Sequence, residues 1–571
     1  MGHALEDSYE VVILGGGLAG LTLALQIKKA RPETSILIAE KREGPAPKGA
    51  FKVGESTIEL GATYFRDVVG MKEHLESEHV EKAGLRFFFP AGDNSDITQR
   101  VEWGSTGWYP MVSHQIDRGT FENALMDRNR AAEGTDVPDG CSVEKVELDA
   151  DGGHKVTVNV DGESHTVDAR WVVDATGRTQ MLKKQLGLGK EVEHTINAAW
   201  FRLENGLDIE EWVDPDNDEW FDRIDERGIR KWSTNHLMGQ GYWVWLIPLS
   251  SGHISIGIVA DPTYHPFEEM DTIEKVMDWF EKHEPQLAAT LRDRHDEVAD
   301  FLKVEDFAYG CERVFSPERW ALTGIAGTFL DPFYSPGSDY IGLSNTFLSD
   351  LVTKELNGED ISDRAEILNI IFLTMFNNQL QLYENLYQLW GNSQVMSAKL
   401  AWDFAIYWSS QPLLFIHEKW TDLDWLISQA EVQGRANELF PRVQSFFRQW
   451  HALEDTPRPP QFFSNKSFDA VWSAQTALKD HYDDEELKTR FQEGMKKVEA
   501  MAIVYFHEVA KRHLGDKAPP ENSKIDALGI SLDPDRWEED GLFSDDGMTL
   551  AEARERAPGI DNIWLEEPVE A

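Results

Sequence analysis

VVILGGGLAG, residues Val11 to Gly20, contains the strongest structural signal in the sequence. Val11 to Leu14 are apolar and mostly branched, which predicts a buried strand. Gly15, Gly17 and Gly20 then form the pattern G-x-G-x-x-G, and apolar residues at helical spacing follow. In this pattern the glycines permit a sharp turn, a close approach of the backbone to a pyrophosphate, and tight packing of a helix on the strand.

A second apolar strand, Ile36 to Ala39, ends at Glu40, 20 residues beyond Gly20. A carboxylate at this distance can accept hydrogen bonds from the hydroxyls of a ribose. The start of the intervening helix, at Leu18 and Ala19, is expected to present unpaired backbone N–H groups that suit phosphate. A glycine-rich turn in another kind of α/β protein is the simpler alternative, but the strand, helix and acid in register favour a dinucleotide-binding domain.

Length and composition indicate a large, acidic protein. With 571 residues the chain exceeds one ordinary core, so two or three domains are expected. There are 101 acidic and 55 basic residues, and the formal net charge of −46 argues against nucleic acid or an anionic membrane as a partner. The two cysteines, Cys141 and Cys311, are unclustered, so neither a disulfide framework nor a cysteine-based metal site is predicted. The first ten residues do not resemble a signal peptide, and a cytoplasmic location is expected.

The remaining sequence predicts an α/β protein whose dinucleotide-binding domain is interrupted. An inserted antiparallel sheet is expected, with a hairpin of Gly241–Leu249 and His253–Ala260, and a helical stretch from Asp271 to Leu302 follows it. A strand at Trp320–Gly324 returns the chain to the first domain, and the sequence beyond it is helical with an acidic tail. The predicted segments are the first part of the dinucleotide-binding domain (1–194), the inserted sheet and helix (195–310), the return segment (311–355) and the C-terminal helical region (356–571).

Two motifs further along the chain connect the glycine pattern with a known fold. Arg118 opens a helical stretch, and Asp174-Ala175-Thr176-Gly177 ends an apolar strand in a tight turn. Together with the glycines, they resemble the Rossmann-type FAD-binding domain of flavoprotein monooxygenases. This resemblance implies FAD as the cofactor and the following residues as its binding site: Gly15, Gly17, Leu18, Ala19, Gly20, Glu40, Arg118, Asp174 and Gly177.

A tryptophan motif narrows the resemblance to flavin-dependent halogenases. Residues 243–248, WVWLIP, match the W-x-W-x-I-P of that family, and Lys52, in FKVGES, lies where the family is expected to keep its catalytic lysine. The family uses reduced FAD, oxygen and halide to form hypohalous acid, which the lysine holds by hydrogen bonding or as a haloamine and delivers to an aromatic ring. The haloamine route requires burial to lower the lysine pKa from about 10.4. Trp243 and Trp245 would then be catalytic residues that keep the substrate from the flavin, although two tryptophans on one strand face are also typical of a plain core.

The segment Phe329–Gly337, FLDPFYSPG, matches the family pattern F-x-x-P-x-x-S-x-G. The resemblance places it under the flavin ring at a helix N-terminus, with Asp331, Pro332 and Gly337 against the cofactor and Ser335 in the catalytic machinery. The glutamate of tryptophan-type halogenases has no evident counterpart, which resembles the branch acting on phenols or pyrroles, either free or on a carrier protein. No second glycine-rich nucleotide motif is present, so a separate flavin reductase is expected to supply the reduced FAD.

Two departures from the family pattern keep other functions open. Pro336 has no N–H where the family offers a donor near the halide. Ile325, after Gly324, replaces an Asp or Asn that would contact the ribityl chain of FAD. The leading hypothesis is an FAD-dependent halogenase of an electron-rich aromatic ring. Pro336 favours instead a flavin monooxygenase or related oxidoreductase without halide chemistry, and Ile325 favours a flavin-binding scaffold with little turnover.

Overall fold

The computed structural model describes residues 5–49, 51–149, 151, 153–454 and 458–564. Within these residues, seven strands form a first sheet in the order β7-β2-β1-β10-β9-β8, with β18 paired to β10. Parallel pairing joins β7, β2, β1, β10 and β18, whereas β8, β9 and β10 form an antiparallel meander. The strands are β1 (Ser8–Leu14), β2 (Ile36–Ala39), β7 (Thr135–Asp136), β8 (Ser142–Glu147), β9 (His154–Val160), β10 (Glu163–Asp174) and β18 (Trp320–Leu322). The predicted Rossmann-type domain with a distant return strand is confirmed.

The glycine-rich turn joins β1 to α1 (Leu18–Ala30). Gly15 has a φ of +110°, which L-residues with side chains rarely adopt. A Cβ at Gly20 would lie 2.1 Å from the carbonyl oxygen of Gly15, so no larger residue fits at Gly20 without a shift. α1 packs against α4 (Arg118–Ala131) and α9 (Gly337–Leu356), which brings the predicted motifs of the first domain together.

Eight strands from the described part of the chain form a second sheet, in the order β16-β12-β15-β14-β13-β4-β5-β19. The predicted hairpin is present, as β14 and β15 pair in antiparallel fashion. The strands are β4 (Leu85–Phe88), β5 (Glu102–Gly104), β12 (Asn197–Leu203), β13 (Thr234–Gly239), β14 (Tyr242–Pro248), β15 (Ile254–Ala260), β16 (Val298–Val304) and β19 (Phe462–Ser464). This sheet is therefore not confined to residues 195–310, because β4 and β5 come from the first segment and β19 from the helical region.

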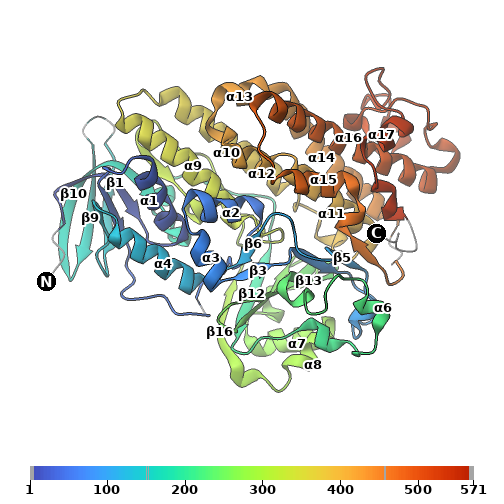
Figure 1. The fold of residues 1–571 in the computed structure, drawn as a ribbon, viewed down its shortest axis with the longest axis horizontal. Helices are drawn as coiled ribbons and strands as arrows, with labels where there is room; N and C mark the ends of the chain where they lie inside the picture. Colours follow the sequence, from blue (N-terminus) through green and yellow to red (C-terminus); the bar gives the residue numbers. More distant parts are fainter. Residues whose placement is uncertain (1–4, 50, 150, 152, 455–457, 565–571) are drawn as a thin grey trace.

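The predicted helical stretch from Asp271 to Leu302 is wrong at its end. α7 (Ile273–His283) and α8 (Pro285–Leu291) form within it, but Leu302 lies in β16, which pairs with β12. These two helices cover one face of the second sheet (Figure 1), where Val244 and Leu246 pack with Trp279 of α7. The alternate residues of β14 point to the opposite face, which turns toward the first domain and the C-terminal helices.

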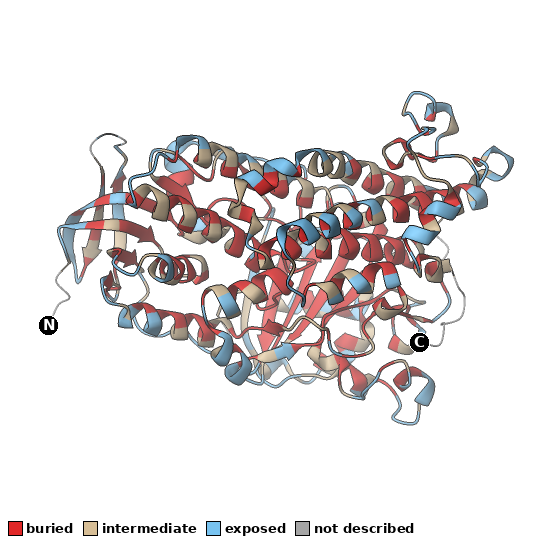
Figure 2. Cartoon of the chain, turned by 45° about the horizontal axis from the view of Figure 1, so that its top comes forward, coloured by how far each residue is buried: buried red, intermediate tan, exposed pale blue. Residues whose placement is uncertain are grey.

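The C-terminal helices lie along the upper side of the molecule in Figure 1. They are α10 (Ser362–Leu380), α11 (Ser393–Trp408), α12 (Gln411–Ile416), α13 (Leu423–Ser428), α14 (Ala430–Leu453), α15 (Asp469–Ala477), α16 (Asp484–Leu514) and α17 (Leu550–Arg556). Buried apolar residues of these helices form one continuous cluster with the first domain and the inner face of the second sheet (Figure 2). The predicted segments consequently share a core.

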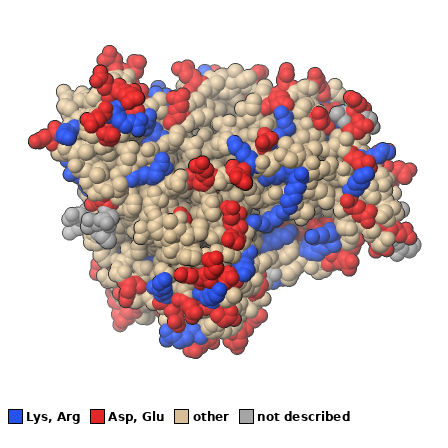
Figure 3. All heavy atoms as spheres, turned by 180° about the vertical axis from the view of Figure 1, so that it is seen from behind, with Lys and Arg blue, Asp and Glu red and all other residues tan. Residues whose placement is uncertain are grey.

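Short elements connect the sheets around the site. They are α2 (Glu59–Thr63), α3 (Lys72–Glu78), β3 (Val80–Lys82), β6 (Ser113–Gln115), α5 (Met181–Leu186) and α6 (Asp218–Phe221). Figure 3 shows the molecule from behind, relative to Figure 1. On this face the acidic side chains form several separate groups, and basic side chains lie between them. Among the helices that the structure describes, none combines the length and the apolar character needed to cross a membrane.

A buried ion cluster ties β4 and β5 to the loop before β13. Glu102, with no exposed surface, accepts hydrogen bonds from Arg86 and, at 2.8 and 3.1 Å, from Arg230. Burial opposes ionisation of Glu102, but Arg230 and Arg86 outweigh it and hold the pKa of this carboxyl at about 2.

We expect Glu102→Gln to reduce the free energy of unfolding by about 3–5 kcal/mol, because it leaves two buried guanidinium groups without a counter-charge. Glu147→Gln is the matched control, since Glu147 forms an exposed ion pair with Lys145 and should contribute at most about 1 kcal/mol. Urea unfolding followed by tryptophan fluorescence measures both. Equal stability of the two variants would contradict a supporting role for the buried cluster.

Candidate functional site

The N-terminus of α1 is open to a ligand. Gly17 is the N-cap residue, and no side chain of the described residues caps the helix. The N–H groups of Leu18, Ala19 and Gly20 lie in its first turn, where the helix itself offers no acceptor. Within 4 Å, a Cβ added at Gly17 would meet only the Nζ of Lys52 among the described atoms, at 3.4 Å. The missing side chain and the unpaired N–H groups form a cradle that fits the pyrophosphate of FAD.

Glu40 lies at the end of β2, as predicted, and its carboxylate is held against the glycine turn. One oxygen accepts a hydrogen bond from the N–H of Gly16 and the other from the N–H of Arg42, each at 2.8 Å. Each carboxylate oxygen has a further lone pair, so Glu40 can still accept a hydrogen bond from a ribose hydroxyl.

Arg118 and Lys52 meet at a buried carboxylate beside this cradle. Glu122, whose side chain has no exposed surface, accepts hydrogen bonds from Arg118 and, at 3.2 Å, from the Nζ of Lys52. Arg118 also donates to the carbonyl oxygen of Val53 at 2.7 Å. The amine of Lys52 lies beside Gly17 of the glycine turn, and Arg118 shares its carboxylate partner; the contact of Arg118 with FAD stays a prediction.

The structure does not support Lys52 as the halogen-carrying lysine. The haloamine route requires a buried amine, whereas the Lys52 side chain is 47% exposed and pairs with a carboxylate. Its position next to Gly17 instead fits a contact with the phosphates of the cofactor. The sequence prediction failed because a motif position does not reveal how much solvent reaches a side chain.

Asp174 acts within its own turn. It is fully buried, one oxygen accepts from the N–H and hydroxyl of Thr176, and the other accepts from the N–H of Leu182 at 2.7 Å. These contacts shape the turn that carries Gly177, where φ is +62°, and they do not point Asp174 at a ligand. The side chain of Ile325 lies 3.7 Å from the position of a Cβ at Gly177, so the two loops that the sequence associated with FAD meet here.

The tryptophan motif and the FLDPFYSPG segment also meet. Trp243 and Trp245 are buried on β14 with their ring centroids 5.7 Å apart, and the ring of Phe333 lies 5.3 Å from that of Trp243. The indole N–H of Trp243 donates to the hydroxyl of Tyr387 at 2.9 Å, and this hydroxyl donates to Asp331. Asp331 is therefore bound to the second sheet and the helical region, a different environment from the flavin contact that the resemblance implies.

The end of the same segment forms the start of α9. Ser335 has a φ of +60°, and its N–H donates to the carbonyl oxygen of Pro332 at 2.8 Å. Pro336 is the N-cap residue and Gly337 is the first helical residue, exposed to solvent. The proline thus removes an N–H from the cap, while the first-turn N–H groups that follow it remain available to an anion.

A buried lysine that the sequence analysis missed lies behind Ser335. The Nζ of Lys82, at the end of β3, donates to the hydroxyl of Ser56 and the carbonyl oxygen of Thr57, each at 2.8 Å. Ser335 also donates to the hydroxyl of Ser56, at 3.0 Å. Burial lowers the pKa of Lys82 to about 7, against the opposing effect of Glu59 and other nearby carboxyls. Strand alternation was the available signal, because Lys82 falls on the same side of a short strand as Val80, opposite an exposed Glu.

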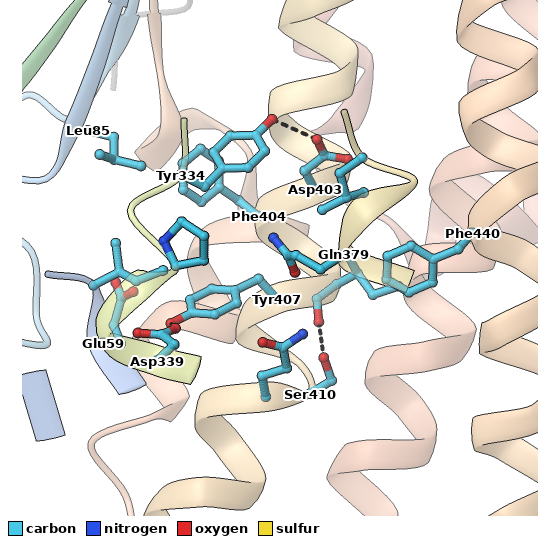
Figure 4. A pocket seen from close by; sticks show the side chains of 15 residues that line it. Glu59, Leu85, Tyr334, Asp339, Gln379, Asp403, Phe404, Tyr407, Ser410 and Phe440 are labelled. Atoms are coloured by element: carbon cyan, nitrogen blue, oxygen red, sulfur yellow. Dashed lines mark hydrogen bonds between the residues drawn. The ribbon is translucent and has the colours of Figure 1, made fainter. Parts of the chain in front are cut away.

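A cavity extends from this region into the C-terminal helices (Figure 4). Apolar side chains form much of its wall, and the hydroxyl of Tyr334 donates to Asp403 at 2.6 Å across one side of it. The lining residues are Ile58, Glu59, Leu85, Tyr334, Pro336, Asp339, Gln379, Leu382, Asp403, Phe404, Ile406, Tyr407, Ser410, Gln411 and Phe440. The helical region, whose role the sequence left open, therefore supplies the wall of this cavity through α10, α11, α12 and α14.

Comparisons with known proteins identify an FAD-binding domain and related halogenases. A family model described as FAD binding domain matches residues 8–255. A flavin-dependent halogenase of Dictyostelium discoideum is 26% identical over 71% of this chain and 70% of its own length. A chlorinase of 1H-pyrrole-2-carbonyl peptidyl-carrier protein from Pseudomonas fluorescens is 25% identical over 58% of this chain and 73% of its own.

The fold also resembles a solved structure of the halogenase PltM in complex with phloroglucinol and FAD. The TM-score is 0.59 at 16% identity, and the alignment covers 86% of this chain and 96% of that one. At this identity the likeness shows the fold alone, while the sequence relatives show that the chain is related to flavin-dependent halogenases. The chain is therefore a homologue of the flavin-dependent halogenases, FAD-dependent enzymes of the oxidoreductase class, and it contains their FAD-binding domain.

Proposed function

We propose that this protein halogenates an electron-rich phenolic or pyrrolic ring, free or on a carrier protein, and that Lys82 carries the halogen. The observation that supports this most directly is the buried amine of Lys82, joined through the hydroxyl of Ser56 to Ser335 in the halogenase-like segment. The carrier-protein substrate of the Pseudomonas fluorescens chlorinase supports the carrier-bound alternative.

In this proposal the open turn of the first domain holds FAD. The N–H groups of Leu18 and Ala19 would bind the pyrophosphate with Arg118 and Lys52, and Glu40 would bind a ribose. Bound in its reduced form, FAD supplies hypohalous acid from oxygen and a halide. A separate flavin reductase would provide the reduced cofactor.

Lys82 would convert the hypohalous acid into a positioned halogen donor. Its neutral amine attacks the halogen, an N–X bond forms while the O–X bond breaks, and the hydroxide leaves with an amine proton as water. A ring carbon of the substrate then attacks the halogen, the N–X bond breaks, and the ring loses a proton to regain aromaticity. Ser56 and Thr57 would orient the amine, because both hold it by hydrogen bonds of 2.8 Å.

Trp243 and Trp245 would exclude the organic substrate from the cofactor. Both rings are buried and pack between Phe333 and Trp200, so they fill space that a substrate would otherwise enter. A role in the core is compatible with the same contacts.

A second candidate, a flavin monooxygenase, is favoured by Pro336, which provides no N–H at the cap of α9. Mass spectrometry of products formed with reduced FAD, oxygen and bromide separates the two candidates. A product that gains bromine supports the halogenase. A product that gains only oxygen, even at high bromide, supports the monooxygenase.

We expect Gly17→Ala and Gly20→Ala to separate cofactor binding from folding. The methyl of Gly17→Ala meets only the flexible end of Lys52 among the described atoms, so the melting temperature should be unchanged while FAD binds at least tenfold more weakly. In Gly20→Ala the methyl meets backbone, so the melting temperature should fall. Flavin fluorescence titration and thermal unfolding measure the two effects. Unchanged FAD affinity in Gly17→Ala would contradict the assigned cradle.

We expect Lys82→Met and Lys52→Met to have opposite effects. Lys82→Met should bind FAD normally but lose halogenation, because no amine remains to carry the halogen. Lys52→Met should halogenate at saturating FAD, with the Kd for FAD raised roughly tenfold by the loss of one phosphate contact. Product analysis and flavin titration test both variants. Full halogenation by Lys82→Met, or its loss in Lys52→Met at saturating FAD, would overturn the assignment.

We expect the halogenation rate to rise with pH up to about 7 and then to level off. Only the neutral amine of Lys82 reacts, and the neutral fraction grows about tenfold per pH unit below its pKa, which burial lowers to about 7. Single-turnover rates with pre-reduced FAD measure this profile. The same midpoint with chloride and with bromide would assign the ionisation to the protein, and a rate still rising at about pH 9 would contradict a buried lysine as the donor.

A further inference from the structure

A buried arginine connects the loop that binds Lys82 to the second sheet. Arg202 lies on β12 and has no exposed surface. Its Nε and Nη2 donate to one carboxylate oxygen of Glu55, which is also buried, at 3.0 and 2.5 Å. Glu55 directly precedes Ser56 and Thr57, the two residues that accept hydrogen bonds from the amine of Lys82. The ion pair therefore lies one residue from the contacts of the proposed halogen carrier.

The guanidinium of Arg202 is also held from its other side. Its Nη1 donates to Asp300 on β16 at 2.9 Å, and the backbone N–H of Arg202 donates to the second oxygen of Asp300 at 2.9 Å. The pairing register between β12 and β16 shifts between Arg202 and Leu203, and such irregularities redirect side chains. Burial opposes the charge of Arg202, but Glu55 and Asp300 outweigh it and raise its pKa. Arg202 thus presents a charged and fixed group to the loop.

The loop has one edge on β6 and another on the second sheet. Ser56 forms an isolated β-bridge with Gln115, so the side chains on either side of Ser56 point away from its own. Glu55 contacts β12, while the hydroxyl of Ser56 contacts Lys82. The backbone N–H of Ile116 donates to the carbonyl oxygen of Glu55 at 2.5 Å. Backbone bonds thus hold the loop to β6, and the ion pair holds its next side chain to the second sheet.

The ion pair suits a role in positioning better than one in stability. A buried ion pair adds little stability compared with well-packed apolar side chains of the same volume, although the loss of one partner is costly. Charged hydrogen bonds do, however, fix direction. Arg202 makes four such bonds to two carboxylates, which an apolar pair would not replace.

We infer that Arg202 is a positioning residue. Through Glu55 it holds Ser56 and Thr57 where both meet the amine of Lys82, so that the amine captures hypohalous acid before it escapes. This inference rests on the proposed function. Without Arg202 the loop would shift against the second sheet and the amine would lose its alignment. Hypohalous acid would still form, but more of it would leave the protein unused.

A competition experiment tests this inference. Holoenzyme with reduced FAD, oxygen and bromide receives phloroglucinol as the probe ring and a large excess of a soluble 1,3-diketone, which takes bromine from free hypobromous acid. Mass spectrometry gives the ratio of brominated phloroglucinol to brominated diketone. We expect Arg202→Met to lower this ratio at least about tenfold toward that of Lys82→Met, because a misplaced amine captures the acid poorly. Total bromination and the Kd for FAD should stay at the wild-type values.

Two further variants separate positioning from stability. Arg202→Met leaves the charge of Glu55 unpaired, so its melting temperature should fall. The double variant Arg202→Met with Glu55→Met removes both charges and should regain most of that loss, yet keep the lowered ratio. Arg100→Met is the matched control, because Arg100 pairs with the buried Glu284 on the face of the second sheet that α7 and α8 cover. It should lower the melting temperature and keep the wild-type ratio.

Each outcome bears on one of the two claims. Equal ratios in the wild type and Lys82→Met would contradict the proposed function itself. With Lys82→Met lowered, a wild-type ratio in the double variant would overturn the inference alone. A loss of FAD binding or of total bromination in the double variant would show a structural role and overturn it as well. An equally lowered ratio in Arg100→Met would have the same consequence, since the ratio would then follow stability.

Discussion

The buried amine of Lys82 donates its hydrogen bonds to neutral acceptors, the hydroxyl of Ser56 and the carbonyl oxygen of Thr57. The proposed halogen transfer depends on these neutral partners, because it needs the uncharged amine. Neutral acceptors bind both the charged and the neutral form of an amine, whereas a carboxylate in contact favours the charged form. Lys399, in the same core, has a carboxylate in contact, since its Nζ lies 2.7 Å from Asp403, although burial lowers the pKa of Lys399 as well. Lys82 meets its carboxyl neighbours at longer range, and burial can then dominate its ionisation.

The position of Lys82 is set by the short strand β3, which pairs with β6 in a separate two-stranded sheet, and by the loops that contact its amine. β3 ends at Lys82, the loop after Phe51 brings Ser56, and the start of α9 brings Ser335 from more than 270 residues away. Strand β14, which carries Trp243 and Trp245, and the C-terminal helices enclose these residues. The halogenase-like motifs thus become one site only when the first sheet, the second sheet and the helical region share a core.

The sequence was sufficient where the signal is local. The glycine turn, the acid after the second strand and the hairpin of β14 and β15 follow from periodicity and spacing, and the structure has them where they were expected. It was insufficient where the role of a residue depends on its exposure to solvent. Lys52 lies in a motif but is half-exposed, and Lys82 lies in no quoted motif but is buried. Asp174 was expected at the cofactor, yet its oxygens are used by its own turn. The end of the helical stretch at Leu302 and the strand β19 depend on pairing with distant strands, which local patterns do not encode.

Two of the buried charge clusters, that of Glu102 and that of Lys82, differ in whether their groups can exchange protons near neutral pH. Arg86, Glu102 and Arg230 form direct hydrogen bonds, and the pKa of Glu102, held at about 2, keeps this cluster ionised at neutral pH. Lys82 and Asp339, by contrast, have pKa values moved to about 7, where a small change in surroundings transfers a proton. A fixed charge can hold strands together, but it cannot exchange protons during a reaction. The incompletely neutralised cluster is therefore the one suited to acid–base chemistry, and it is the one that borders the cavity.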